Sequence, residues 1–122
     1  MTLRAKVLTV SDGVAAGSRD DKSGTALVAR LQDAGYEVAA HEVSPDGRDA
    51  VAEALRALTT GFAGLVVTTG GTGFGPRDLT PEGTRAVMER EAPGLAEAMR
   101  RVSDRGDRSF GMLSRGACGT VG

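Results

Sequence analysis

The chain has 122 residues, which suits a single domain, and its acidic and basic residues are interleaved to a formal net charge of −1. This balance excludes a broad electrostatic attraction for nucleic acid or an anionic membrane surface. The single cysteine, Cys118, excludes an internal disulfide and is typical of a reducing compartment. No leader-like apolar run precedes the first strand signal, and none approaches the roughly 20 residues that span a bilayer. We therefore expect a cytoplasmic protein.

The hydrophobic pattern predicts strands and helices in alternation along most of the chain. Short apolar runs that end in turn signals predict strands at 5–10, 36–43 and 64–69. The third of these is apolar enough to be covered on both faces. Apolar residues at helical spacing predict helices at about 24–34 and 48–59.

The segment after the third strand and its loop is expected to be mostly helical. Thr80 is predicted to cap a helix whose first residue is Pro81. Pro93 and Gly94 are predicted to interrupt this helix. The rest is read as a helical stretch, a charged loop and a glycine-spaced end, at 95–102, 104–109 and 111–122.

The order strand, helix, strand, helix, strand, helix predicts an α/β fold, with a mostly parallel sheet flanked by helices in a three-layer sandwich. Ligands of such sheets bind beyond the carboxyl ends of the strands. The loops expected at that edge are 11–13, 45–47 and 70–80. These loops bring hydroxyl groups, carboxylates and exposed main-chain N–H groups to one edge of the sheet.

The loop after the third strand contains Gly70, Gly71, Gly73 and Gly75, with the hydroxyl of Thr72 among them. Glycines leave main-chain N–H groups open to phosphate or another anion. The loop lacks the lysine and hydroxyl residue of a nucleoside-triphosphatase P-loop, and no acidic residue completes a dinucleotide fingerprint. The alternative is a tight strand-to-helix turn that binds no ligand.

Two aspartates, Asp46 and Asp78, follow the second and third strands and are candidate Mg²⁺ ligands beside phosphate. Each could instead be a turn or helix-terminus residue. Asp12 could be a third carboxylate at the same edge or a turn former. Their joint placement with the glycine loop favours a metal-phosphate site.

Other candidates are weaker. His41, the only histidine, is expected to serve packing or the surface, and with Cys118 it makes no zinc site. Four basic residues could contact phosphate or could be ordinary solvated side chains: Arg19, Lys22, Arg77 and Arg115. No aromatic platform for nucleic acid is present.

Several motifs then occur in a recognisable order: Thr9-Val10-Ser11-Asp12, Asp21-Lys22-Ser23-Gly24, Pro45-Asp46, Thr69-Gly70-Gly71-Thr72-Gly73, Pro76-Arg77-Asp78-Leu79-Thr80-Pro81-Glu82, Glu91-Ala92-Pro93-Gly94 and Leu113-Ser114-Arg115. With them the chain resembles the molybdopterin adenylyltransferase family, which includes the bacterial MogA and MoaB group and the G domain of gephyrin. The resemblance covers essentially the whole chain, and the long central motif is its most specific part.

The resemblance implies a homotrimer that binds molybdopterin and Mg-ATP, transfers AMP to the terminal phosphate of the pterin and releases pyrophosphate. The product would pass to a molybdate-inserting partner. By the same resemblance, Asp46 and Asp78 would be the catalytic and metal-binding carboxylates. The substrate-binding residues would be Ser11, Asp12, Gly70, Gly71, Thr72, Gly73, Ser103 and Ser114.

Family members continue with another strand, a loop of the type asparagine-leucine-proline-glycine and a helix. We therefore expect residues 1–122 to form a single domain that lacks this C-terminal strand and helix. One alternative function is a non-catalytic molybdopterin-binding or scaffolding trimer. Another is a detached domain of a molybdate-inserting or competence-damage-type protein, which is disfavoured because those chains are much longer and Met1 leads directly into the first strand.

Overall fold

The computed structural model describes residues 2–104 and 110–122. Its elements in chain order are β1 (Leu3–Val10), α1 (Asp12–Ala15), α2 (Lys22–Asp33), β2 (Tyr36–Ser44), α3 (Arg48–Thr59), β3 (Leu65–Thr69), α4 (Thr80–Val87), β4 (Arg90–Glu91), α5 (Pro93–Ser103), the 3-10 turn η1 (Gly111–Leu113) and β5 (Gly119–Thr120). The charged loop expected at 104–109 lies outside the described residues except for Asp104.

Three strands form the main sheet in the order β2-β1-β3, and both pairings are parallel. The central strand β1 pairs Leu3 with Tyr36 of β2 and Ala5 with Leu65 of β3. A small antiparallel ladder joins β4 to β5, where Arg90 lies opposite Thr120. The predicted parallel sheet flanked by helices is therefore confirmed.

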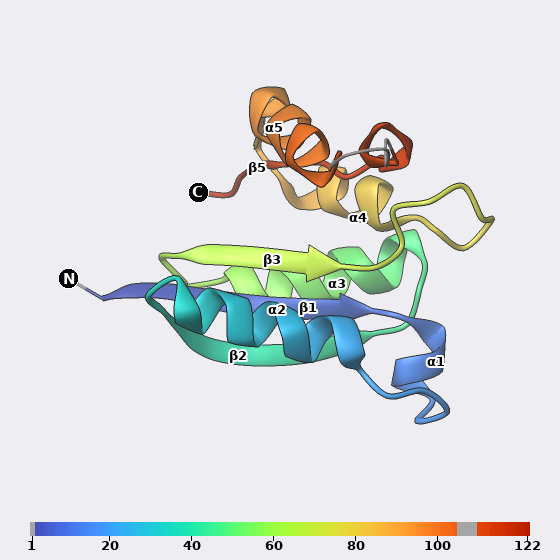
Figure 1. Ribbon diagram of the computed structural model, residues 1–122, viewed down its shortest axis with the longest axis horizontal. Coiled ribbons are helices and arrows are strands. Elements are labelled where there is room, and N and C mark those ends of the chain that lie inside the picture. Colours follow the sequence, from blue (N-terminus) through green and yellow to red (C-terminus); the bar gives the residue numbers. More distant parts are fainter. Residues whose placement is uncertain (1, 105–109) are drawn as a thin grey trace.

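The sheet is covered on its two faces by different helices, α2 on one and α3 on the other (Figure 1). Successive side chains of a strand point to opposite faces, so β1 supplies both cores. On the α2 face the buried core residues are Ala5, Val7 and Leu31. On the α3 face they are Leu8, Val10, Val51, Leu55 and Leu58.

Helices α4 and α5 and the last residues lie together beside β3 (Figure 1). Helix α4 packs closely on α3, because a Cβ on Gly83 would lie 2.7 Å from the Cβ of Val51. The loops that follow β1, β2 and β3 emerge at the same end of the sheet. This end is where the sequence predicted a ligand site.

Strand β3 departs from its prediction. Val66 and Val67 do contact the cores on opposite faces, but the strand is only half-buried and Leu65 is 40 % exposed. The cause is position rather than composition, because β3 is at the edge of the sheet as described and pairs with β1 alone.

The predicted cap of α4 is wrong. Thr80 is the first residue of the helix, Leu79 precedes it without a side-chain cap, and the buried Thr80 hydroxyl donates to the carbonyl oxygen of Gly70 at 2.8 Å. The helix then ends at Val87, and β4 separates it from α5, so Pro93 begins a new helix instead of interrupting one.

Near the start, a short helix α1 takes the place of the turn expected at 11–13, because the Ser11 hydroxyl accepts from the amide of Val14 and caps it. Helix α2 begins earlier than expected, since the carboxylate of Asp21 accepts from the amide of Gly24 at 2.9 Å. Within the described residues, the helices are too short or too polar to cross a membrane.

Candidate functional site

Two hollows lie side by side at the carboxyl end of the sheet, and Gly70 lines both of them. The first, here the aspartate hollow, has a volume of about 610 Å³ and is lined by residues that include Ser11, Arg19, Lys22, Asp46, Gly71 and Asp78. The second, here the threonine hollow, has a volume of about 230 Å³ and is lined by residues that include Thr69, Thr72, Thr84, Arg100, Ser103 and Ser114.

The wall between the hollows requires glycine at two consecutive positions. Gly70 and Gly71 have φ angles of +100° and +69°, a region that side chains disfavour. There is no room either, because a Cβ on Gly70 would lie 2.1 Å from the carbonyl oxygen of Val10 and one on Gly71 would lie 2.2 Å from the hydroxyl of Thr80. The loop is therefore pressed against the end of β1 and the start of α4.

The carboxylates of Asp46 and Asp78 both face the aspartate hollow. One oxygen of each is held by a backbone amide, at 3.0 Å in both cases: Asp46 Oδ2 accepts from Asp12, and Asp78 Oδ2 accepts from Gly75. Asp46 Oδ1 faces the glycine loop, 3.3 Å from where a Cβ of Gly71 would be. Among the described residues no hydrogen bond to either Oδ1 atom is found.

Asp12 does not join these carboxylates at the hollow. Its two oxygens are engaged by the guanidinium of Arg77, with Nε–Oδ2 at 2.6 Å and Nη2–Oδ1 at 3.0 Å. The hydrogen bonds from Arg77 hold the pKa of Asp12 below its usual range and raise the pKa of Arg77 in turn. Asp12 therefore stays ionised and paired, and Arg77 is held by protein groups.

The lining of the aspartate hollow also includes Arg19 and Lys22, with Asp21 between them in the sequence region 19–22. The Asp21 carboxylate accepts from the hydroxyl of Thr9 at 2.8 Å and lies 2.9 Å from Nε2 of His41. His41 thus links β2 to the residue that caps α2. No ion pair within the described residues involves Arg19 or Lys22.

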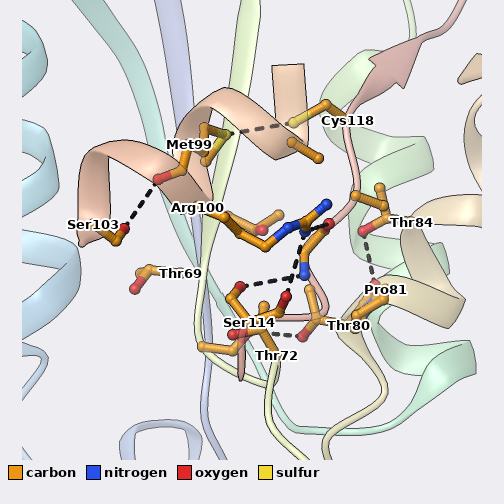
Figure 2. A pocket seen from close by; sticks show the side chains of 15 residues that line it. Thr69, Thr72, Thr80, Pro81, Thr84, Met99, Arg100, Ser103, Ser114 and Cys118 are labelled. Carbon is orange, nitrogen blue, oxygen red and sulfur yellow. Dashed lines mark hydrogen bonds between the residues drawn. The ribbon is translucent and has the colours of Figure 1, made fainter. Parts of the chain in front are cut away.

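Hydroxyl groups and one cation surround the threonine hollow (Figure 2). Thr69, Thr72, Thr80 and Thr84 come from β3, the glycine loop and α4. Helix α5 faces them with Arg100, whose Nη1 donates to the carbonyl oxygens of Ser114 and Gly116 at 3.3 and 3.0 Å. This side chain therefore holds the returning segment 114–118 against the helix.

Ser103 and Cys118 lie at the α5 side of the threonine hollow (Figure 2). The Ser103 hydroxyl donates to the carbonyl oxygen of Met99 at 3.0 Å, within its own helix. The sulfur of Cys118 lies 3.4 Å from that of Met99, and burial raises the pKa of this thiol. Cys118 is thus a poor nucleophile at neutral pH.

The sequence-predicted site residues therefore divide into groups. The aspartate hollow receives Ser11, Asp46, Gly70, Gly71 and Asp78, and the threonine hollow receives Gly70, Thr72, Ser103 and Ser114. Asp12 and Gly73 line neither hollow, and the Gly73 carbonyl oxygen instead accepts from Nε of Arg115 at 2.8 Å.

Sequence reasoning missed two contributors to this end of the sheet. Asp21 appears only as part of a motif, although its position before Lys22-Ser23-Gly24 is typical of a helix N-cap. Arg100 carries no signal that separates it from the other arginine of α5, Arg101.

A parallel α/β sandwich with a glycine loop and two aspartates at one edge defines a ligand-binding α/β domain. Residues 6–121 match the family described as "probable molybdopterin binding domain", and the chain belongs to this family.

Curated relatives agree with this family. The chain is 35 % identical to molybdenum cofactor biosynthesis protein B of Bacillus cereus, over 98 % of this chain and 71 % of that protein. It is 38 % identical to molybdopterin adenylyltransferase of Escherichia coli, over 84 % of this chain and 54 % of that protein. It spans 38 % of the length of a molybdenum cofactor biosynthesis bifunctional protein of Chlorobaculum tepidum, to which it is 37 % identical.

Solved structures confirm the fold. The molybdopterin biosynthesis enzyme MoaB of Thermus thermophilus superimposes with a TM-score of 0.87 at 43 % identity, over 99 % of this chain and 76 % of that one. A MogA structure gives a TM-score of 0.87 at 38 % identity, over 98 % of this chain and 78 % of that one. The CinA protein of Thermoplasma acidophilum, at 23 % identity and a TM-score of 0.64, shares the fold alone.

Proposed function

We propose that this protein acts in molybdenum cofactor biosynthesis and transfers AMP from Mg-ATP to the terminal phosphate of molybdopterin, with release of pyrophosphate. A phosphate oxygen of the pterin would form a bond to the α-phosphorus of ATP. The bond between that phosphorus and the oxygen that bridges it to the β-phosphorus would break, and this oxygen would leave with pyrophosphate. The paired carboxylates of Asp46 and Asp78 beside the glycine loop are the observation that carries this proposal.

The aspartate hollow suits Mg²⁺ with phosphate. Asp46 and Asp78 each keep one carboxylate oxygen outside the hydrogen bonds found among the described residues. No cluster of three or more metal-ligating side chains occurs in 2–104 and 110–122. Two carboxylates that leave the other positions to phosphate oxygens and water are the ligand set that Mg²⁺ prefers. When bound there, Mg²⁺ would neutralise charge on the transferring phosphoryl group.

Other groups of the two hollows support the binding of ATP in the aspartate hollow and of the pterin in the threonine hollow. Arg19 and Lys22 add positive charge to the lining of the aspartate hollow, which would favour a polyphosphate there. The hydroxyl groups of the threonine hollow offer donors and acceptors to the heteroatoms of a pterin, and Gly70 lets both ligands approach the same backbone. The reacting phosphates would then meet over the glycine loop.

Purified protein incubated with molybdopterin, ATP and Mg²⁺ tests the proposal through pyrophosphate release. Release that requires molybdopterin supports an adenylyltransferase. Binding of molybdopterin without any release would instead support a non-catalytic molybdopterin-binding or scaffolding protein, which the family description also allows.

Variants Asp46→Asn and Asp78→Asn should each lower the rate by about 100-fold or more, because removing one group that stabilises transition-state charge has effects of that order. Asp49→Asn is the matched control, since Asp49 is 93 % exposed on α3 and pairs only with Arg48 among the described residues. Full activity in both site variants would contradict the assignment.

We further propose that the protein works as a homotrimer and passes its product to a molybdate-inserting protein. Leu95, Phe110 and Met112 are 62 %, 71 % and 73 % exposed, so α5, Phe110 and η1 present apolar surface that a second copy could cover. Light scattering on the eluting protein would decide the oligomeric state, and a monomer at micromolar concentration would contradict it.

A further inference from the structure

Asp12 and Asp46 hold one another through a reciprocal pair of hydrogen bonds. The amide of Asp12 donates to Asp46 Oδ2, and the amide of Asp46 donates to Asp12 Oδ1, both at 3.0 Å. The loop after β1 is thereby joined to the loop after β2. The contact fixes one oxygen of Asp46 and so decides where the other oxygen points, which is toward Gly71.

Two neighbouring carboxylates repel each other, and Arg77 supplies the charge that offsets this repulsion. Its guanidinium binds both oxygens of Asp12 and also donates from Nη2 to the main-chain carbonyl oxygen of Asp46 at 3.0 Å. Arg77 belongs to the loop after β3, so a single side chain links all three strand-ending loops.

Stability alone does not account for this arrangement. The side chains of Arg77 and Asp12 are 62 % and 46 % exposed. Ion pairs this exposed contribute little to the free energy of folding. The planar fork of arginine does, however, impose a defined geometry on a carboxylate, which a flexible ammonium group does not.

We propose that Arg77 is a positioning residue, which clamps Asp12 and thereby aims Asp46 Oδ1 at the metal-nucleotide without touching phosphate itself. The role rests on the proposed function, since it needs a ligand at Asp46. The hydrogen bond from the Asp46 amide to Asp12, which Arg77 holds, can be measured in the free protein. The contact itself is therefore tested separately from the proposed function.

The first experiment needs no ligand. Amide hydrogen exchange of the free protein, followed by NMR, should show the Asp46 amide exchanging roughly tenfold faster or more in Arg77→Ala than in the wild type, because its acceptor is no longer held. The amide of Ser11 is the internal control, since it donates to the Ser44 carbonyl oxygen at 2.9 Å and does not depend on Asp12. Unchanged exchange at Asp46 would overturn the proposal.

The second experiment measures Mn²⁺ affinity in the presence of a non-hydrolysable ATP analogue, together with turnover. Arg77→Ala and Asp12→Asn should each weaken Mn²⁺ binding and lower kcat by roughly 10- to 100-fold, the usual effect of losing a group that orients a ligand. The KM for ATP should stay near the wild-type value. The Mn²⁺ affinity and kcat of the double variant should be no lower than those of the more impaired single variant, because both substitutions act through the same contact.

Arg77→Lys keeps the charge but loses the fork, so its Mn²⁺ affinity should fall between those of the wild type and Arg77→Ala. This variant also provides the comparison if Arg77→Ala does not fold. Arg48→Ala is the matched control, because Arg48 is 57 % exposed, pairs with Asp49 and lines neither hollow. Wild-type behaviour is expected of it.

A loss of ATP-analogue affinity in Arg77→Ala that Asp12→Asn does not reproduce would show that Arg77 contacts phosphate, and would overturn the proposal. Wild-type protein that binds neither Mn²⁺ with the analogue nor molybdopterin would instead overturn the proposed function. The role given to Arg77 would fall with it, even where exchange at Asp46 still responds to the variant.

Discussion

The guanidinium of Arg115 donates from Nη1 to Glu82 Oε2 at 2.8 Å and so fastens the segment after η1 to the first turn of α4. The same side chain donates to the carbonyl oxygens of Gly73 and Asp78, at 2.8 and 2.6 Å. The far side of the glycine loop is therefore held by an arginine that comes more than thirty residues later in the sequence.

The contact between Arg115 and Glu82 predicts that the free energy of unfolding decreases at acidic pH. The hydrogen bond from Arg115 lowers the pKa of Glu82, so its stabilising contribution is present above the ordinary pKa of a glutamate and is lost as the pH falls through the lowered value. Urea unfolding between about pH 6 and pH 3 should show a smaller loss of stability in Glu82→Gln than in the wild type. Arg115→Met should behave like Glu82→Gln. Equal slopes in all three proteins would refute the prediction.

Gly71→Ala should destabilise the protein strongly, by about 2–4 kcal/mol, because the new Cβ adds both an unfavourable φ and an overlap with Thr80. Gly61→Ala separates the two causes, since Gly61 has a φ of +67° with nothing within 4 Å of its Cβ position. It should lose only about 1 kcal/mol. Chemical denaturation of both variants provides the comparison, and similar losses would mean that crowding at Gly71 is unimportant.

Thr80→Val removes a buried hydroxyl at nearly constant volume. The hydrogen bond from this hydroxyl to the carbonyl oxygen of Gly70 would be lost, and the net contribution of such a bond to stability is about 0.5–1.5 kcal/mol. Thr60→Val is the control, because the Thr60 hydroxyl also donates to a carbonyl oxygen, that of Arg56, but at an exposed position where water can replace it. We expect thermal unfolding to separate the two variants, and a harmless Thr80→Val would show that Gly70 finds another donor.

Cys118 should react slowly with iodoacetamide. Burial raises the pKa of its thiol, so the reactive thiolate is scarcer at pH 8 than in the unfolded chain, and the rate should be lower than in urea. The sign of the shift gives a second readout: in the folded protein the rate should still be rising with pH after it has levelled off in urea. If the reaction of the folded protein were slow but levelled off at the same pH as the reaction in urea, restricted access of the reagent would be the cause, and the raised pKa would be contradicted.

Much of this architecture follows from local patterns. The bounds predicted for α3, 48–59, coincide with the observed helix, because its apolar spacing is strong and residues 44–47 form a clear strand break. The parallel sheet follows from the alternation of strands and helices, and this alternation also brings Asp46 and Asp78 to one edge.

Long-range contacts explain what the patterns missed. The engagement of Asp12 depends on Arg77, which is 65 residues away in the sequence, so no local rule could assign it. The division of the site into two hollows depends on where α5 and the segment 114–118 return to the sheet. The cap expected of Thr80 is wrong because Thr80 is already the first residue of the helix, where its hydroxyl donates to the carbonyl oxygen of Gly70 in the preceding loop.

The central position of β1 also constrains how the chain can fold. Both of its neighbours come later in the sequence, and the pairing of Ala5 with Leu65 closes a loop of sixty residues. Non-local parallel pairings of this kind form slowly, because the entropy of loop closure precedes any gain from contact. One edge of β1 must therefore stay unpaired until residues 65–69 have been synthesised, although β2, α2 and α3 precede them in the chain. Synthesis should thus bring a window of aggregation risk that ends when β3 docks.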